Sequence, residues 1–160
     1  MKVISNTSPV LNLTLVHQER LLKDLYHSII ITTAVYDELQ IYDLKLAKRI
    51  LQSNWVEISE VQNRQQIDGL LDDLDIGEAE AIVLSAQIHT DLLLIDEKKG
   101  RTIAAQYDIP VAGTLSILIK SKENGLIHSV KPVLNRLISD AGFWIKEDLY
   151  FHVLERSGEL

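Results

Sequence analysis

The chain has 160 residues, which suits one domain spanning residues 1–160 with a sizeable core. Its composition, 46% hydrophobic and 24% charged, excludes a disordered tail, a collagen-like fibre and a coiled-coil rod. With no cysteine there is no disulfide framework, no thiolate nucleophile and no Cys-based zinc site, and we expect a reducing, cytoplasmic environment. The net charge of -7 argues against nucleic-acid binding through overall positive charge, so such binding needs a local basic patch or a bound metal.

No long apolar stretch follows the first residues, and we therefore expect no secretory signal. The longest apolar runs are a few residues, whereas a membrane-spanning helix needs about 20. We expect no contact with a membrane.

Short β-branched or apolar runs alternate along the chain with longer segments of helical periodicity. The predicted strands cover residues 2–5, 28–32, 54–59, 91–96 and 109–111. The predicted helices cover residues 33–52, 62–74, 77–89, 103–107, 114–123 and 130–139, with another that starts at Pro9 after an N-cap at Ser8. The 77–89 segment is almost continuously apolar, so we expect that helix to be buried.

This alternation predicts βαβ units with right-handed crossovers, hence an α/β fold whose parallel sheet is covered on both faces. In such sheets, ligands bind outside the carboxyl ends of the strands. Oxygen-bearing side chains from distant parts of the sequence follow those ends. They are Asn6, Thr7, Ser8, Asp37, Glu38, Glu78, Glu80, Asp96 and Glu97.

An acidic stretch from Gln65 to Glu97 contains nine Asp or Glu residues and no Lys or Arg. Crowded carboxylates repel one another unless protons or a cation intervene. A hard divalent cation such as Mg²⁺ or Mn²⁺ prefers oxygen ligands, and paired metals clamp the attacking and leaving oxygens of phosphodiester cleavage. The sequence therefore predicts a metal site at this edge of the sheet.

Helix capping is the alternative role for part of this stretch. Residues 75–78 match a capping box, in which the Glu78 side chain returns to the backbone N–H of Asp75. Glu78 and Glu80 point to nearly opposite sides of a helix, so one of them binds a metal, and Glu80 is that ligand if Glu78 caps. We interpret Asp37 and the acids at 72, 73 and 75 as solvent-facing, and Asp91 as the start of its strand.

A short basic run, EKKGR at residues 97–101, follows Asp96 directly. Metals that hold a scissile phosphate need cations nearby for the adjoining phosphates. Lys98 and Arg101 are candidates, and Arg101 is favoured because its planar fork binds phosphate or a carboxylate. The alternative is a charged turn that enters a helix. Thr7 and Ser8 are candidates to orient substrate or water, although capping is the simpler role for Ser8.

Several blocks in this order resemble the motifs of PIN-domain proteins. They are VISNTSP at 3–9, AVYDEL at 34–39, LDIGEAEAI at 74–82, LLIDEKKGR at 93–101, and PVAGTL at 110–115 with KENGLI at 122–127. The last pair is similar to a bacterial and archaeal PIN-like subfamily. The likeness covers most of the chain, roughly residues 2–127.

The resemblance implies a three-layer α/β/α sandwich with a parallel sheet of about five strands. It implies an Mg²⁺- or Mn²⁺-dependent ribonuclease that cleaves RNA, often the toxin of a toxin–antitoxin pair and often a homodimer. The four acidic positions of the family fall on Asn6, Glu38, either Glu80 or Glu78, and Asp96, with Glu97 as the other choice for the fourth. In this reading Glu38, Glu80 and Asp96 are catalytic. Asn6 departs from the usual aspartate and removes one negative charge from the site, which lowers its expected affinity for metal.

A non-catalytic protein- or RNA-binding module on the same fold is the second hypothesis, and Asn6 motivates it. Nucleotide sites of other types are excluded, because the chain has neither a G-x-x-x-x-G-K-[ST] loop nor a G-x-G-x-x-G after its first strand. The histidines show no metal-ligand spacing. The aromatic segment 143–154 is expected to pack on the core, with a dimer or antitoxin contact as the alternative.

Overall fold

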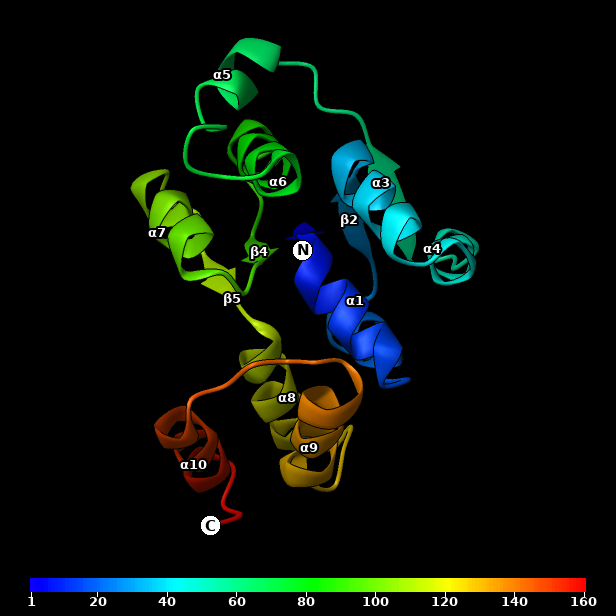
Figure 1. Ribbon diagram of the computed structural model, residues 1–160, viewed down its shortest axis with the longest axis vertical. Coiled ribbons are helices and arrows are strands. Elements are labelled where there is room, and N and C mark those ends of the chain that lie inside the picture. Colours follow the sequence, from blue (N-terminus) through cyan, green and yellow to red (C-terminus); the bar gives the residue numbers. More distant parts are fainter.

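A computed structural model describes residues 1–160 as one sheet of five strands with ten helices around it (Figure 1). The strands are β1 (Val3–Ser5), β2 (Ile29–Thr32), β3 (Val56–Ser59), β4 (Leu92–Leu94) and β5 (Val111–Ala112). The helices are α1 (Thr7–Leu15), α2 (Arg20–Tyr26), α3 (Thr33–Tyr42), α4 (Leu44–Leu51), α5 (Arg64–Asp68), α6 (Ile76–Gln87), α7 (Lys98–Gln106), α8 (Thr114–Glu123), α9 (Val130–Asp140) and α10 (Glu147–Arg156). No helix is long and apolar enough to cross a membrane.

All strand pairs are parallel, in the order β3-β2-β1-β4-β5, which confirms the predicted α/β/α sandwich. The chain builds outward from β1 to β3 on one side and then returns to place β4 and β5 on the other. The order reverses between β1 and β4, where Ile4 lies opposite Leu93. A crevice opens at such a switch point because the connections leave it in opposite directions.

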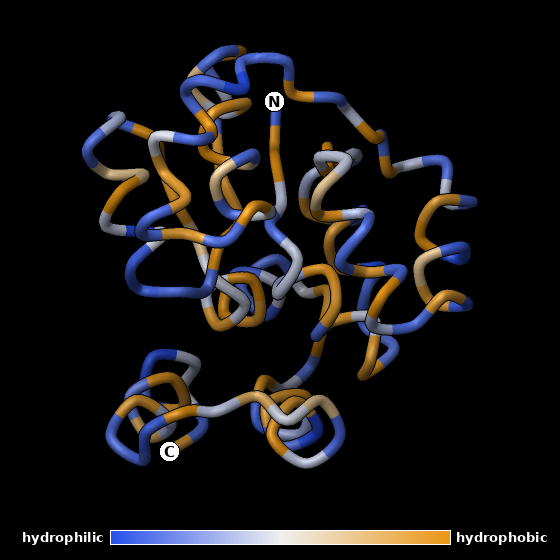
Figure 2. The backbone as a smooth tube through the Cα atoms, turned by 45° about the horizontal axis from the view of Figure 1, so that its top comes forward, coloured by the Kyte–Doolittle hydropathy of each residue, from blue (hydrophilic) through white to orange (hydrophobic).

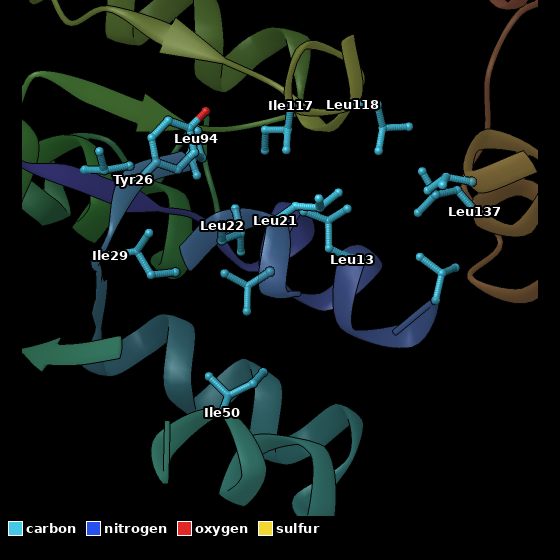
Figure 3. Packing of buried hydrophobic residues seen from close by; sticks show 14 of the residues in the cluster. Leu13, Leu21, Leu22, Tyr26, Ile29, Ile50, Leu94, Ile117, Leu118 and Leu137 are labelled. Atoms are coloured by element: carbon cyan, nitrogen blue, oxygen red, sulfur yellow. The ribbon is translucent and has the colours of Figure 1, made fainter. Parts of the chain in front are cut away.

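The sheet separates two apolar clusters because side chains alternate along each strand. Val3 and Leu94 join the larger cluster, which α1, α2, α8 and α9 cover; Figure 3 shows Leu13, Leu22 and Leu137 converging there. Ile4 joins the smaller cluster under α6 and α7. Hydrophobic stretches accordingly run through the interior strands of the backbone, whereas hydrophilic ones dominate the outer turns (Figure 2). The prediction that the 77–89 helix is buried is confirmed, since residues 77–85 of α6 are all buried.

Several predicted helix boundaries were wrong. The single helix predicted at 33–52 is two helices, because Asp43 has an extended backbone and caps α4 by accepting a hydrogen bond from the Leu46 N–H at 3.1 Å. The predicted helix 62–74 shortens to α5 followed by turns. Helix α7 begins at Lys98 rather than near residue 103, so the basic run is its first turn and not a loop. Helix α2 was not predicted.

The capping role predicted for Ser8 is also wrong. Helix α1 starts two residues earlier, at Thr7, and Asn6 is the N-cap residue. Ser8 lies inside the first turn, where its hydroxyl is free to reach another part of the chain. Pro9 therefore occupies the third helical position instead of the first.

The aromatic segment near the C-terminus packs only in part on the core. Val153 and Leu154 are buried, whereas Trp144 is 78% exposed and Phe151 is 45% exposed. The segment that carries Trp144 crosses α8 on its way from α9 to α10 (Figure 1). Core packing is thus confirmed for Val153 and Leu154 of α10 and contradicted for Trp144.

Candidate active site

The carboxyl ends of β1 and β4 place Asn6 beside Glu97 at the switch point of the sheet. The Asn6 amide Nδ2 donates a long hydrogen bond of 3.5 Å to Glu97 Oε2. The Asn6 backbone N–H donates to the Leu94 carbonyl at 2.8 Å, which extends the β1–β4 ladder by one residue and fixes where the side chain starts. Residues 91 positions apart in sequence therefore meet where the sheet opens.

The side-chain oxygen of Asn6 is buried and has no hydrogen-bond partner. Asn6 is only 3% exposed, so its side chain lies away from bulk solvent. An N-cap side chain ordinarily accepts from the second or third helical residue, but here the third is Pro9, which has no N–H. A buried acceptor without a partner costs free energy, and such an atom points to a missing ligand.

Glu38, on α3, is held against the start of α1 and the start of α6. The Thr7 hydroxyl donates to Glu38 Oε2, and the Gly77 N–H donates to Oε1 at 3.2 Å. A Cβ at position 77 would lie 2.5 Å from Oε1, so only glycine permits this approach. Burial raises the pKa of Glu38 above its ordinary value, the charges of Asp75 and Glu80 add to the rise, and the two hydrogen bonds oppose it.

Glu78, one residue further on, faces the same space. Its backbone N–H donates a hydrogen bond to Asp75 Oδ1 at 2.8 Å, as the capping box predicts. Its carboxylate does not accept the second hydrogen bond of that motif, from the Asp75 N–H. Burial raises the pKa of Glu78 to about 8, with further contributions from the charges of Asp75, Glu97 and Glu38. This carboxyl thus interacts with both Glu38 and Glu97.

Glu97 completes what we call the acidic cluster, namely Asn6, Glu38, Glu78 and Glu97. The residue as a whole is exposed, yet desolvation of its carboxyl group raises its pKa, assisted by the charges of Asp96 and Asp75, while the Asn6 amide acts in the opposite sense. All three carboxyls of the cluster therefore resist ionisation. The unpaired oxygen of Asn6 is the one that stays neutral at every pH.

Glu80 points elsewhere, as the helical spacing predicts for residues two apart. It is buried, accepts from the Ala34 N–H at the start of α3 at 3.0 Å, and pairs with Arg64 at 3.3 Å. Both of its oxygens are therefore used in holding α3 and α5 against α6. The structure brings Glu78, and not Glu80, next to Glu97.

Asp96 forms a separate, fully bonded network on the other side of Asn6. Its Oδ1 accepts from the Thr114 N–H at 2.7 Å, and its Oδ2 accepts from the hydroxyls of Thr114 and Ser8 at 2.8 and 2.9 Å. Asn12 in turn donates to the Ser8 hydroxyl at 3.0 Å. These bonds hold the end of β4 against the first turns of α1 and α8. The Ser8 hydroxyl therefore binds Asp96 and does not cap a helix.

The cations of the basic run differ in their surroundings. Lys99 pairs with Asp73 at 3.2 Å, whereas neither Lys98 nor Arg101 has an ion-pair partner. The Arg101 guanidinium lies beside Gly113, where an added Cβ would be 3.3 Å from Nη1 and 2.8 Å from Asp96 Oδ1. Gly113 therefore keeps open a space that Arg101 and Asp96 share.

The acidic cluster suits a hard divalent cation in the chemistry of its donors. It offers a buried, unpaired amide oxygen and three carboxyls that repel one another. A bound Mg²⁺ or Mn²⁺ would supply the missing partner of Asn6, neutralise the carboxylates and polarise a phosphate oxygen. With the side chains as they stand, however, no three acidic or histidine groups lie close enough together to hold one metal ion.

Comparison with known protein families identifies the family of this chain. A family described as a PIN domain matches residues 2–159. The chain belongs to the PIN-domain family. No curated protein and no solved structure matches it. PIN domains have a nuclease-like fold and generally use divalent metal ions, which agrees with acidic side chains gathered at the switch point of the sheet.

Two residues that shape this PIN site were not singled out in the sequence: Thr114 binds Asp96 through two atoms, and Gly77 lets Glu38 approach α6. Asp75 is exposed and caps α6, as the solvent-facing position and the capping box predicted from the sequence require. A glycine inside a helical pattern is the one signal available, because such a residue lowers helix propensity and indicates a close approach. Nothing in the local pattern of Thr114 signals its partner, which lies 18 residues away.

Proposed function

We propose that this PIN domain is a divalent-metal-dependent endoribonuclease that hydrolyses RNA phosphodiester bonds. The observation that carries the proposal is the acidic cluster, in which three carboxyls have raised pKa values and Asn6, whose amide nitrogen contacts Glu97, has a buried side-chain oxygen without a partner. Perturbed carboxyls gathered in one crevice are typical of functional sites, since a structural role is better served by satisfied groups. The family is consistent with this chemistry.

In this proposal, Asn6, Glu38, Glu78 and Glu97 hold Mg²⁺ or Mn²⁺. The sequence assigned the third acidic position to Glu80 or Glu78, and the contacts favour Glu78 because both oxygens of Glu80 are engaged with Ala34 and Arg64. Asp96 positions the end of β4 through Ser8 and Thr114. A role for Glu80 or Asp96 as a metal ligand stays a prediction, which the position of a Mn²⁺ ion in a crystal tests.

Cleavage of labelled single-stranded RNA by the purified protein tests the proposal. We expect cleavage with Mg²⁺ or Mn²⁺ and none with EDTA, and we expect Glu78→Gln to slow it by more than about 10-fold, because losing a ligand costs at least as much as losing a group that supports one. Asp37→Asn is the matched control, since Asp37 is an exposed acid beside Glu38 on α3. Absence of cleavage under all metal conditions would contradict the proposal, as would full activity in Glu78→Gln.

A non-catalytic binding module is the second candidate, and two observations favour it. Asn6 stands where a carboxylate would strengthen metal binding, and no three acidic side chains are placed to chelate an ion without moving. This candidate predicts no heat of Mn²⁺ binding in calorimetry and no effect of Glu38→Gln or Asp96→Asn on the growth of producing cells. Loss of a growth-inhibiting effect in those variants would contradict it.

We also propose that the protein is the toxin of a toxin–antitoxin pair and forms a homodimer. Apolar side chains at the junction of α3 and α4 support a dimer: Ile41, Tyr42, Leu44 and Leu51 are between 44% and 86% exposed. Exposed apolar patches are common at interfaces between subunits. Light scattering after size exclusion measures the mass directly, and a value of 18.1 kDa at micromolar concentration would contradict the dimer.

A further inference from the structure

A cleft of about 580 Å³ adjoins the acidic cluster on the side of Asp96. Its lining includes Asp96, Glu97, Arg101 and Gly113, together with Trp144 from the segment between α9 and α10. Leu115 and Ser116 of α8 also line the cleft. The volume falls within the range of small-ligand sites, so a nucleotide unit fits it.

Arg101 is the free cation of this cleft. It is exposed, it has no ion-pair partner, and Gly113 leaves space in front of its guanidinium. The neighbouring carboxylate of Asp96 accepts hydrogen bonds from Thr114 and Ser8 and forms no ion pair with Arg101. A guanidinium in this state is suited to bind a phosphate through two parallel hydrogen bonds.

Trp144 is the aromatic surface of this cleft. Its side chain is 78% exposed, although tryptophan is ordinarily well buried in a folded protein. Gly142, two residues before Trp144, has φ +67°, a left-handed backbone that glycine adopts readily. Trp144 and Arg101 line the same cleft, and together they provide the two elements of single-strand recognition, which are a stacking surface for a base and a cation for the backbone.

We propose that this cleft binds single-stranded RNA, with an unpaired base stacked on Trp144 and an adjoining phosphate on Arg101. The proposal rests on the proposed nuclease function, because the cleft opens onto the acidic cluster and would hold the nucleotide next to the scissile phosphate. Unpaired bases are favoured over a duplex because only a splayed base offers its face to an indole. Trp144 and Arg101 therefore select single-stranded substrate at a position next to the bond that is cleaved.

Tryptophan fluorescence reports this binding without requiring cleavage. The chain has two tryptophans, and Trp55 is 9% exposed, so quenching by a ligand comes from Trp144. We expect an eight-nucleotide single-stranded RNA to quench the emission, in EDTA or in Mg²⁺, and a blunt duplex of the same sequence to quench much less. Trp144→Phe retains Trp55 as the emitter, and we expect the quenching to disappear in that variant.

The affinity of the same RNA, measured by anisotropy of a terminal label, then separates stacking from mere proximity. We expect Trp144→Ala to weaken binding about 10-fold or more, Trp144→Phe to weaken it less, and Arg101→Ala to weaken it and flatten its salt dependence. Phe151→Ala and Arg20→Ala are controls that remove an exposed aromatic and an exposed cation outside the cleft, and both are expected to bind as the parent does.

The outcomes distinguish the two proposals. Quenching by single-stranded RNA without any metal-dependent cleavage supports the cleft and contradicts the nuclease. Cleavage without quenching, or with unchanged RNA affinity in Trp144→Ala, overturns the cleft and leaves the nuclease standing. Equal quenching by duplex and single strand also overturns the cleft, as does a Trp144 surface that responds to a protein partner but not to RNA.

Discussion

Asn6 contributes a neutral oxygen to a cluster whose other members are carboxyls. Its oxygen has no partner, and Pro9 removes one of the two N–H groups that an N-cap side chain ordinarily uses. The amide keeps the metal-free site from carrying a fourth negative charge, and it offers a cation less attraction than a carboxylate would. The identity of this one residue therefore balances the stability of the metal-free protein against its affinity for metal.

Restoring a carboxylate at position 6 tests this balance. We expect Asn6→Asp to tighten Mn²⁺ binding about 10-fold or more in calorimetry, because it adds a charge within contact distance of the ion. The melting temperature in EDTA is expected to fall at the same time, because the new charge joins three carboxyls that already repel. Unchanged Mn²⁺ affinity would show that Asn6 does not face the metal; Asn135→Asp, at the surface of α9, is the control.

Gly77 determines how closely Glu38 approaches α6. We expect Gly77→Ala to lower the free energy of unfolding by about 1–3 kcal/mol, because the new Cβ would lie 2.5 Å from Glu38 Oε1 and displace it. Urea denaturation measures the change. Gly69→Ala is the matched control, since a Cβ there meets nothing closer than 3.5 Å and the backbone is already helical. Equal effects of the two variants would contradict the role given to Gly77.

Among the elements, one carboxylate, that of Glu159, contacts both α8 and α9. Glu159 accepts from the Val130 and Lys131 N–H groups at the start of α9 at 2.7 and 3.0 Å, and from Lys122 of α8 at 3.0 Å. Burial alone would raise the pKa of Glu159, but these hydrogen bonds outweigh it and hold the pKa at about 2. The segment after α10 is thereby tied to both helices beneath it.

The pH dependence of this contact follows from the lowered pKa. Stability from Glu159 is fully present above pH 4.5, its ordinary pKa, and is lost as the pH falls toward 2. We expect Glu159→Gln to unfold more easily than the parent at pH 7, by about 1–3 kcal/mol, and the difference to shrink toward zero near pH 2. Urea titrations at several pH values measure it. A difference independent of pH would contradict the assignment; Glu155→Gln, an exposed acid of α10, is the control.

The elements also show what local patterns predict and what they do not. The strands and α8 lie close to their predicted places because runs such as residues 92–95 have one strong periodicity. The break at Asp43 has a local cause, since Asp43 caps α4, but the early start of α7 depends on a tertiary contact. Gly100 of α7 packs where a Cβ would lie 2.5 Å from Ile95, and the packing offsets the poor helix propensity of glycine. For the candidate site, the sequence predicted the edge of the sheet at which these side chains meet, but a preference for Glu78 over Glu80 needed the contacts of Glu80 with Arg64 and Ala34.

For the whole molecule, the acidic cluster links folding stability to pH and to metal. The pKa of Glu78 is raised to about 8 from 4.5, so the folded protein binds its proton more tightly than the unfolded chain does. Metal-free stability therefore falls as the pH rises from 4.5 to 8. A cation bound by the ionised cluster removes this loss.

Thermal unfolding measures that linkage directly. We expect Mg²⁺ or Mn²⁺ to raise the melting temperature more at pH 8.5 than at pH 6, because the cluster must lose its protons to bind a cation. Glu78→Gln is expected to be more stable than the parent in EDTA at pH 8.5 and to respond weakly to metal. Asp37→Asn should behave as the parent does. A metal effect of equal size at both pH values would contradict the linkage.

The position of a bound metal tests the central claim most directly. Crystals grown or soaked in Mn²⁺ are examined for anomalous difference density at the carboxyl ends of β1 and β4. We predict a peak in contact with Asn6 Oδ1 and with carboxylates of Glu38, Glu78 and Glu97. A peak bound instead by Glu80 or Asp96, or no peak at the cluster in crystals grown above pH 8, would contradict the account.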